Sequence, residues 1–208
     1  MKIGVLHLSD LHIESDNYSD KVDAIVNACN YDVKQVSHLY IVITGDIAKY
    51  GRTDEYTKAK EFISTLQEKI KPANSVLQIK VIIVSGNHDC CFDDVKSTRK
   101  TILKDCLKDV IEEKDYFNDA LAVQDNFWNF YKEINGSIPT DKISYSIEVT
   151  PYLNNKIVFH CYDSSWMSEI KEVYGKIVIP ENKFIKNESG NITISPPVKL
   201  VVARYEKQ

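Results

Sequence analysis

The stretch LHLSDLH, residues 6–12, changes within a few positions from an apolar run to side chains that bind metal ions. It ends an apolar segment, residues 2–8, whose pattern predicts a buried β-strand. A strand that needed only burial would keep its apolar pattern, but this one runs into Asp10 and His12. Carboxylate and imidazole groups are common ligands of divalent metal ions. The residues at the ends of the next strands therefore decide how this stretch is interpreted.

Two further apolar runs, residues 38–44 and 78–85, are continuous in Leu, Ile and Val, as strands of parallel sheets tend to be. Between the three runs, residues 19–30 and 53–70 carry apolar side chains at helical spacing, and Thr53 is expected to cap the second helix. The resulting β-α-β-α-β order predicts a parallel sheet with crossover helices. In such sheets the ligand site lies outside the carboxyl ends of the strands.

Each predicted strand is followed by polar residues of ligand type, in the order D-x-H, G-D and G-N-H-D: Asp10, His12, Asp46, Asn87, His88 and Asp89. Because the carboxyl ends of parallel strands meet at one edge of the sheet, these clusters are predicted to converge. Converging carboxylates at Asp10, Asp46 and Asp89 would be unfavourable without a compensating metal ion. The three clusters therefore predict a metal site.

The residue types fit a pair of divalent cations. Asp10, His12, Asp46 and Asn87 offer oxygen and nitrogen ligands for Mn²⁺, Fe²⁺ or Zn²⁺, and the two oxygens of a carboxylate can bridge two ions. Two ions roughly 3.5–4 Å apart suit the hydrolysis of phosphate esters, because they activate a bound water and neutralise charge on the phosphate. His88 is the candidate general acid for the leaving oxygen.

Together the motifs resemble those of the calcineurin-like metallophosphoesterases, and the resemblance is strong over residues 3–89. LHLSDLH is especially similar to members that act on phosphodiesters. The resemblance implies an α/β fold, a four-layer αββα sandwich with a dinuclear metal centre. It also implies a role for each matched residue: the first ion is bound by Asp10 and His12, the bridge is Asp46, the second ion is bound by Asn87, and His88 acts on the transition state or leaving group.

The second half departs from the family pattern. Where the family has a histidine after a strand similar to residues 199–203, this chain has Arg204, and the family's final G-H-x-H is absent from the sequence. Three histidine ligands are missing by this pattern, so the centre holds either two ions or only one. His160 is the remaining candidate for a substitute ligand, although a core position is its default interpretation. His7 is expected to pack or cap, and His38 to lie far from the site.

Residues 92–139 are predicted to be a helical insertion over the site, within a single domain of residues 1–208. Apolar periodicity predicts helices at 93–113 and 119–134, and Gly136 ends the second. Aromatic side chains in the second are predicted to be core rather than a platform for bases: Phe127, Trp128, Phe130 and Tyr131. The insertion is the expected source of substrate choice.

Four short apolar runs predict a second sheet: residues 143–150, 156–163, 175–180 and 198–205. Because the final family motif is absent, this sheet is expected to be incomplete, with an uncovered edge that another chain can pair with. A homodimer or a completing subunit is the corresponding hypothesis.

The composition excludes some classes of partner and of compartment. With 43% hydrophobic and 27% charged residues the chain is an ordinary globular one, and a net charge of -4 gives no general attraction to nucleic acid or membranes. No apolar stretch is long enough to span a membrane. Five cysteines without a C-x-x-C pair, and no export signal, predict a cytoplasmic protein.

The predicted function is metal-dependent hydrolysis of a phosphate ester by a metal-bound hydroxide, with a phosphodiester favoured over a monoester. A nucleotide or nucleic acid is within the range of substrates. The alternative is a catalytically impaired family member that binds a nucleotide, a phosphate or a protein partner. In a third hypothesis, the 208 residues are a shortened form of a longer enzyme, or another subunit completes the site.

Overall fold

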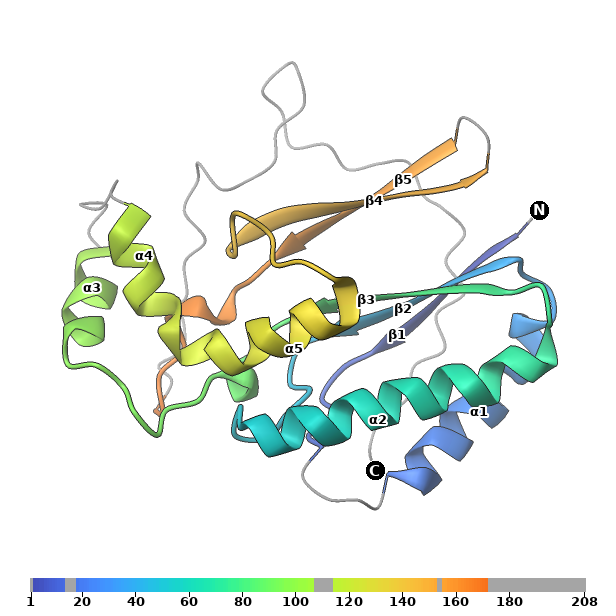
Figure 1. Ribbon diagram of the computed structural model, residues 1–208, viewed down its shortest axis with the longest axis horizontal. Helices are drawn as coiled ribbons and strands as arrows, with labels where there is room; N and C mark the ends of the chain where they lie inside the picture. Colours follow the sequence, from blue (N-terminus) through green and yellow to red (C-terminus); the bar gives the residue numbers. More distant parts are fainter. Residues whose placement is uncertain (1, 14–17, 107–113, 153–154, 172–208) are drawn as a thin grey trace.

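A parallel sheet and two helices form the first part of the chain (Figure 1). The computed structural model describes residues 2–13, 18–106, 114–152 and 155–171. The sheet has the order β1-β2-β3, and its strands are joined by two crossover helices: β1 (Ile3–Leu8), α1 (Ser19–Val33), β2 (His38–Thr44), α2 (Thr53–Ile70) and β3 (Gln78–Val84). All neighbouring strands pair in parallel, as predicted.

Both helices cover one face of this sheet because each has a continuous apolar stripe (Figure 1). In α2 the side chains of this stripe are all buried: Tyr56, Ala59, Ile63, Leu66 and Ile70. The expected capping by Thr53 is wrong, because its hydroxyl lies 3.3 Å from Asn126 Oδ1 instead. The carboxylate of Glu55 accepts a hydrogen bond from the backbone N–H of Arg52 at 2.9 Å and so replaces a capping side chain.

An antiparallel hairpin, β4 (Ser144–Tyr152) and β5 (Asn155–Tyr162), lies on the other face of the parallel sheet (Figure 1). The rings of Tyr40 and Phe159 meet between the two sheets with centroids 5.2 Å apart. The hydroxyl of Tyr145 donates a hydrogen bond to the carbonyl of Ile83 at 2.8 Å. The described residues thus build three layers of an α/β sandwich: helices, parallel sheet and hairpin. The runs predicted at 175–180 and 198–205, and Arg204, lie outside the described residues.

The middle of the chain is helical, as predicted, but its second helix is divided. This middle part of the chain forms α3 (Thr98–Cys106), α4 (Lys114–Leu121), a short 3₁₀ turn at Ala122–Gln124 and α5 (Asp125–Asn135). Gly136 ends α5 at φ 86°, a left-handed conformation that glycine adopts readily.

The aromatic side chains of α5 belong to the main core, as predicted, with exposures of 0 to 4%: Phe127, Trp128, Phe130 and Tyr131. Helices α3 and α4 instead pack with Trp166 and Met167 in a separate, smaller cluster. Figure 1 shows these two helices at the end of the molecule toward which β1, β2 and β3 run. The role of residues 92–139 as an insertion over the site stays a prediction. No described helix has the length and apolar character that crossing a membrane requires.

Candidate metal centre

The loops that follow the three parallel strands are hydrogen-bonded to one another. The backbone N–H of His12 donates to the carbonyl of Asp46 at 2.9 Å, so the first two loops stay paired beyond their strands. The backbone N–H of His88 donates to Asp46 Oδ1 at 3.0 Å, which ties the third loop to the same residue. Asp46 therefore lies at the centre of the site, between the first and third motifs.

Three of the predicted metal ligands have a left-handed backbone. Asp10, His12 and Asp46 have φ of 55°, 44° and 53°, and they are the non-glycine residues of the described chain with positive φ. Side chains other than glycine adopt this conformation at an energetic cost, and such strain concentrates at functional sites. The strained backbone at these three positions is thus consistent with a functional role for their side chains.

One group of side chains in the described residues can hold a metal ion by distance. One ligand atom from each of His12, Asp46 and His88 lies within 4.8 Å of the others. The imidazole rings of His12 and His88 meet edge to face, with centroids 4.5 Å apart. Asp10 is exposed and lies outside this group, and Asn87 is half-buried on the third loop. His88, predicted as a general acid, therefore lies among the potential ligands.

A backbone carbonyl fixes the orientation of His88. Its Nδ1 lies 2.8 Å from the carbonyl oxygen of Lys49. A carbonyl can only accept a hydrogen bond, so Nδ1 carries the proton, and Nε2 is the ring nitrogen left for other contacts. Lys49 has no sequence signal for this role because the contact uses its backbone.

The surroundings of His12 favour its neutral form. Burial lowers the pKa of His12, and the neighbouring His88 lowers it further, while the carboxylates of Asp46 and Asp10 act in the opposite direction. The neutral imidazole is the form that binds a metal ion. The local environment therefore favours the ligand state of His12.

Two glycines allow the second and third loops to approach closely. A methyl group on Gly45, which has φ 87°, would lie 2.7 Å from the Cα of Gly86. A methyl group on Gly86 would collide with the side chain and backbone of Asp46. Glycine is required at Gly86 by lack of space alone, since its φ of -115° is open to any residue. The G-D and G-N-H-D motifs thus need their glycines to bring Asp46 beside His88.

Asp89 is fully buried and connects these loops through hydrogen bonds. Its carboxylate accepts hydrogen bonds from the backbone N–H groups of Gly86 at 2.8 Å, Ala48 at 2.9 Å and Ile47 at 3.3 Å, and from the hydroxyl of Tyr56 at 3.1 Å. Burial raises the pKa of Asp89 to about 6, although these four donors lower it. The expectation that Asp89 needs a metal ion is therefore wrong, because protein donors compensate its charge.

The three histidines other than His12 and His88 do not complete the site. All five histidines of the sequence lie within the described residues. His7 Nε2 is 2.7 Å from Thr44 Oγ1, and His38 lies at the opposite end of β2 against Tyr152. His160 is exposed on the outer face of the hairpin, with Nδ1 3.0 Å from Ser146 Oγ. His160 thus takes neither the default core position nor the place of a ligand, because the alternation of β5 turns its side chain away from the parallel sheet.

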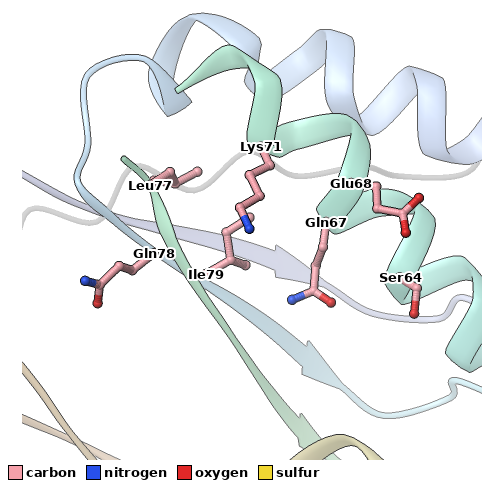
Figure 2. Close-up of a pocket in the computed structure, with 7 residues that line it drawn as sticks. All are labelled: Ser64, Gln67, Glu68, Lys71, Leu77, Gln78 and Ile79. Carbon is pink, nitrogen blue, oxygen red and sulfur yellow. The ribbon is translucent and has the colours of Figure 1, made fainter. Parts of the chain in front are cut away.

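A pocket of about 590 Å³ lies at the other end of the sheet, between α2 and the start of β3 (Figure 2). Seven residues line it: Ser64, Gln67, Glu68, Lys71, Leu77, Gln78 and Ile79. Its single carboxylate and single amine do not form a metal-binding set. The candidate metal ligands therefore lie at the carboxyl ends of the strands and not in this pocket.

Comparison with known proteins gives matches to phosphoesterases. The sequence model of the calcineurin-like phosphoesterase family matches residues 3–197. A probable cyclic nucleotide phosphodiesterase of Vesicomyosocius okutanii subsp. Calyptogena okutanii (strain HA) is 32% identical over 92 residues, which cover 43% of this chain and 34% of that protein. The glycerophosphodiester phosphodiesterase GpdQ of Enterobacter lignolyticus (strain SCF1) is 32% identical over 94 residues, 41% of this chain and 30% of that protein. The chain thus spans about a third of the length of the curated relatives it matches. No solved structure shows significant similarity to it.

Proposed function

The chain belongs to the calcineurin-like phosphoesterase family, and on this basis we propose that it hydrolyses a phosphodiester with the help of divalent cations. Both named relatives are phosphodiesterases, which supports a diester over a monoester. A nucleotide or a glycerophosphodiester is the kind of molecule that their names suggest.

The observation that carries the proposal is the geometry of His12, Asp46 and His88. Two imidazoles and one carboxylate, with ligand atoms within 4.8 Å, are a suitable donor set for Mn²⁺, Fe²⁺ or Zn²⁺. The left-handed backbone of both His12 and Asp46 supports a functional reason for this arrangement.

We assign the first ion to Asp10, His12 and Asp46, and the contact to a second ion to Asp46 and Asn87. When bound, such ions activate a water and neutralise charge on the phosphate oxygens. This chain has no further imidazole near the centre, so the second ion is held less well than the first or is absent. A second copy of the chain, or another subunit that supplies ligands, stays a prediction.

His88 is assigned to the leaving oxygen of the ester. The carbonyl of Lys49 holds Nδ1–H, so Nε2 is the atom that can deliver a proton. Because Nδ1 carries the proton that Lys49 accepts, Nε2 is also the nitrogen that an ion beside His12 and Asp46 would take. It cannot bind an ion and carry a proton at once. His88→Gln separates the two roles: loss of turnover with metal affinity retained supports the general acid, and loss of metal affinity supports the ligand.

The test is hydrolysis of bis(p-nitrophenyl) phosphate in the presence of Mn²⁺, Fe²⁺ or Zn²⁺, with Asp46→Asn beside the native chain. The expected loss is at least about 100-fold, because disturbing even the groups behind metal ligands costs about 10- to 100-fold. His160→Ala is the control, since that side chain lies on the exposed face of the hairpin. Equal rates in Asp46→Asn and the native chain would contradict the assignment. Metal binding without turnover would instead favour a catalytically impaired binding protein.

A further inference from the structure

Tyr50 is an exposed aromatic residue in a loop that contacts the candidate metal centre through its backbone. It lies in the loop after β2, four positions beyond Asp46, and is 52% exposed. The residue before it, Lys49, supplies the carbonyl that holds His88. The Tyr50 ring is therefore attached to the same short loop that orients the proposed general acid.

This loop is fixed, so the exposure of the ring is not a result of a loose backbone. The N–H of Tyr50 lies 3.0 and 3.2 Å from the two carboxylate oxygens of Glu55, a side chain that is only 4% exposed. The carbonyl of Gly51 accepts a hydrogen bond from Asn126 Nδ2 at 2.9 Å. A methyl group on Gly51 would lie 2.8 Å from the carbonyl oxygen of Asp89, so the loop also packs directly on the third motif.

Two cationic side chains lie against the Tyr50 ring. Lys49 Nζ and Arg52 Cζ each lie 5.3 Å from the centroid of the Tyr50 ring. Arg52 is also paired with Asp93 at 3.1 Å, which holds the guanidinium in place. The loop thus carries an exposed aromatic ring and a planar guanidinium, and both are groups on which nucleobases stack.

From this placement we infer that Tyr50, with Arg52 and Lys49 around it, binds a planar aromatic group of the substrate. The substrate class is a phosphodiester that carries a nucleobase or an aryl group, in preference to a purely alkyl diester. The inference rests on the proposed function, because it assigns a substrate class to the same site.

The test compares two substrates in one set of variants. Adenosine 3′,5′-cyclic monophosphate carries a planar base, and glycerophosphoethanolamine carries none. Tyr50→Leu is expected to lower kcat/KM for the first substrate about tenfold more than for the second, mainly through KM, as expected for the loss of a stacking contact. Tyr50→Trp should restore most of the difference. Tyr31→Leu is the control, because Tyr31 is a 75% exposed tyrosine on α1.

Equal losses on both substrates, or no loss on either, would overturn the inference while leaving the phosphodiesterase proposal intact. If the native chain hydrolyses neither substrate, equilibrium binding of adenosine 5′-monophosphate tests the aromatic subsite instead. The proposed function itself fails only if bis(p-nitrophenyl) phosphate is not hydrolysed either. Weaker binding by Tyr50→Leu with retention by Tyr50→Trp would still support the aromatic subsite. Equal binding by all variants, or no binding by the native chain, would reject it.

Discussion

Asp89 shows how single residues hold the site in shape without touching a substrate. Its buried carboxylate accepts hydrogen bonds from backbone N–H groups of the loops after β2 and β3 and from a hydroxyl of α2. The N–H groups would otherwise be buried without partners, which costs free energy. The G-N-H-D motif therefore combines two kinds of residue: Asn87 and His88 are proposed to act on the metal ions and substrate, and Asp89 supports the backbone.

Tyr56→Phe tests this support. The hydroxyl of Tyr56 lies 3.1 Å from both the carbonyl oxygen and Oδ1 of Asp89, and the residue is 4% exposed. Loss of one hydrogen bond to a buried carboxylate is expected to lower the free energy of unfolding by about 1–3 kcal/mol. Urea denaturation at pH 7.5 measures the change. Tyr31→Phe, at a 75% exposed position, should change stability by less than about 0.5 kcal/mol. Similar small changes in both variants would contradict a supporting role for the hydroxyl.

At the scale of helices and strands, the apolar periodicity predicts the three parallel strands and α2 closely but misses the break before α5. The predicted helix at 119–134 is interrupted at Ala122–Gln124. Gln124 is fully buried there, where it donates to Ser165 Oγ at 2.9 Å and accepts from Trp128 Nε1 at 3.2 Å. Because Ser165 comes from the segment after β5, no pattern within the helix itself can indicate this break.

The segment after β5 also contains a buried acid whose ionisation should affect stability. Burial raises the pKa of Asp163, although the hydrogen bonds from Ser165 lower it. Its Oδ1 accepts from the N–H and hydroxyl of Ser165, while Oδ2 has no hydrogen-bond partner in the described part of the chain. The folded state thus holds the proton more tightly than the unfolded state.

The sign of the pH effect follows from this raised pKa. Stability from Asp163 is greatest below its unfolded pKa of about 3.9 and decreases as pH rises through the higher folded pKa. Asp163→Asn removes the titration. The stability of the native chain minus that of Asp163→Asn should therefore decrease from pH 4 to pH 7.5, measured by urea denaturation. Asp94→Asn, at an exposed site, should show no such trend. A difference that increases with pH would contradict the prediction.

At the scale of the whole molecule, the proposed centre lies at the carboxyl ends of the strands of the parallel sheet. The loops carrying Asp10, Asp46 and Asn87 extend from three adjacent strands, so the folded sheet is a condition for the site. A metal ion that binds only this arrangement must stabilise the folded state.

Added Mn²⁺ is therefore expected to raise the free energy of unfolding. At a free concentration of 100 times Kd, the increase is about 2.7 kcal/mol, and a chelator should reverse it. His12→Ala should abolish the effect, whereas His160→Ala should retain it because that histidine is exposed on the hairpin. Thermal unfolding with and without Mn²⁺ measures both variants. An equal shift in His12→Ala and the native chain would show that Mn²⁺ binds elsewhere.

The sequence by itself determined the α/β class, the three parallel strands and the residues at their carboxyl ends. These features follow from local periodicity and from the rule that parallel strands end at one edge of a sheet. Only the tertiary structure decided that Asp89 is compensated by protein donors, that His160 faces outward and that the carbonyl of Lys49 holds the ring of His88. The physical reason is that these outcomes depend on contacts between segments far apart in the chain. The face of β5 that turns inward, for example, is set by the packing of Phe159 on Tyr40, which the alternation of β5 alone does not specify.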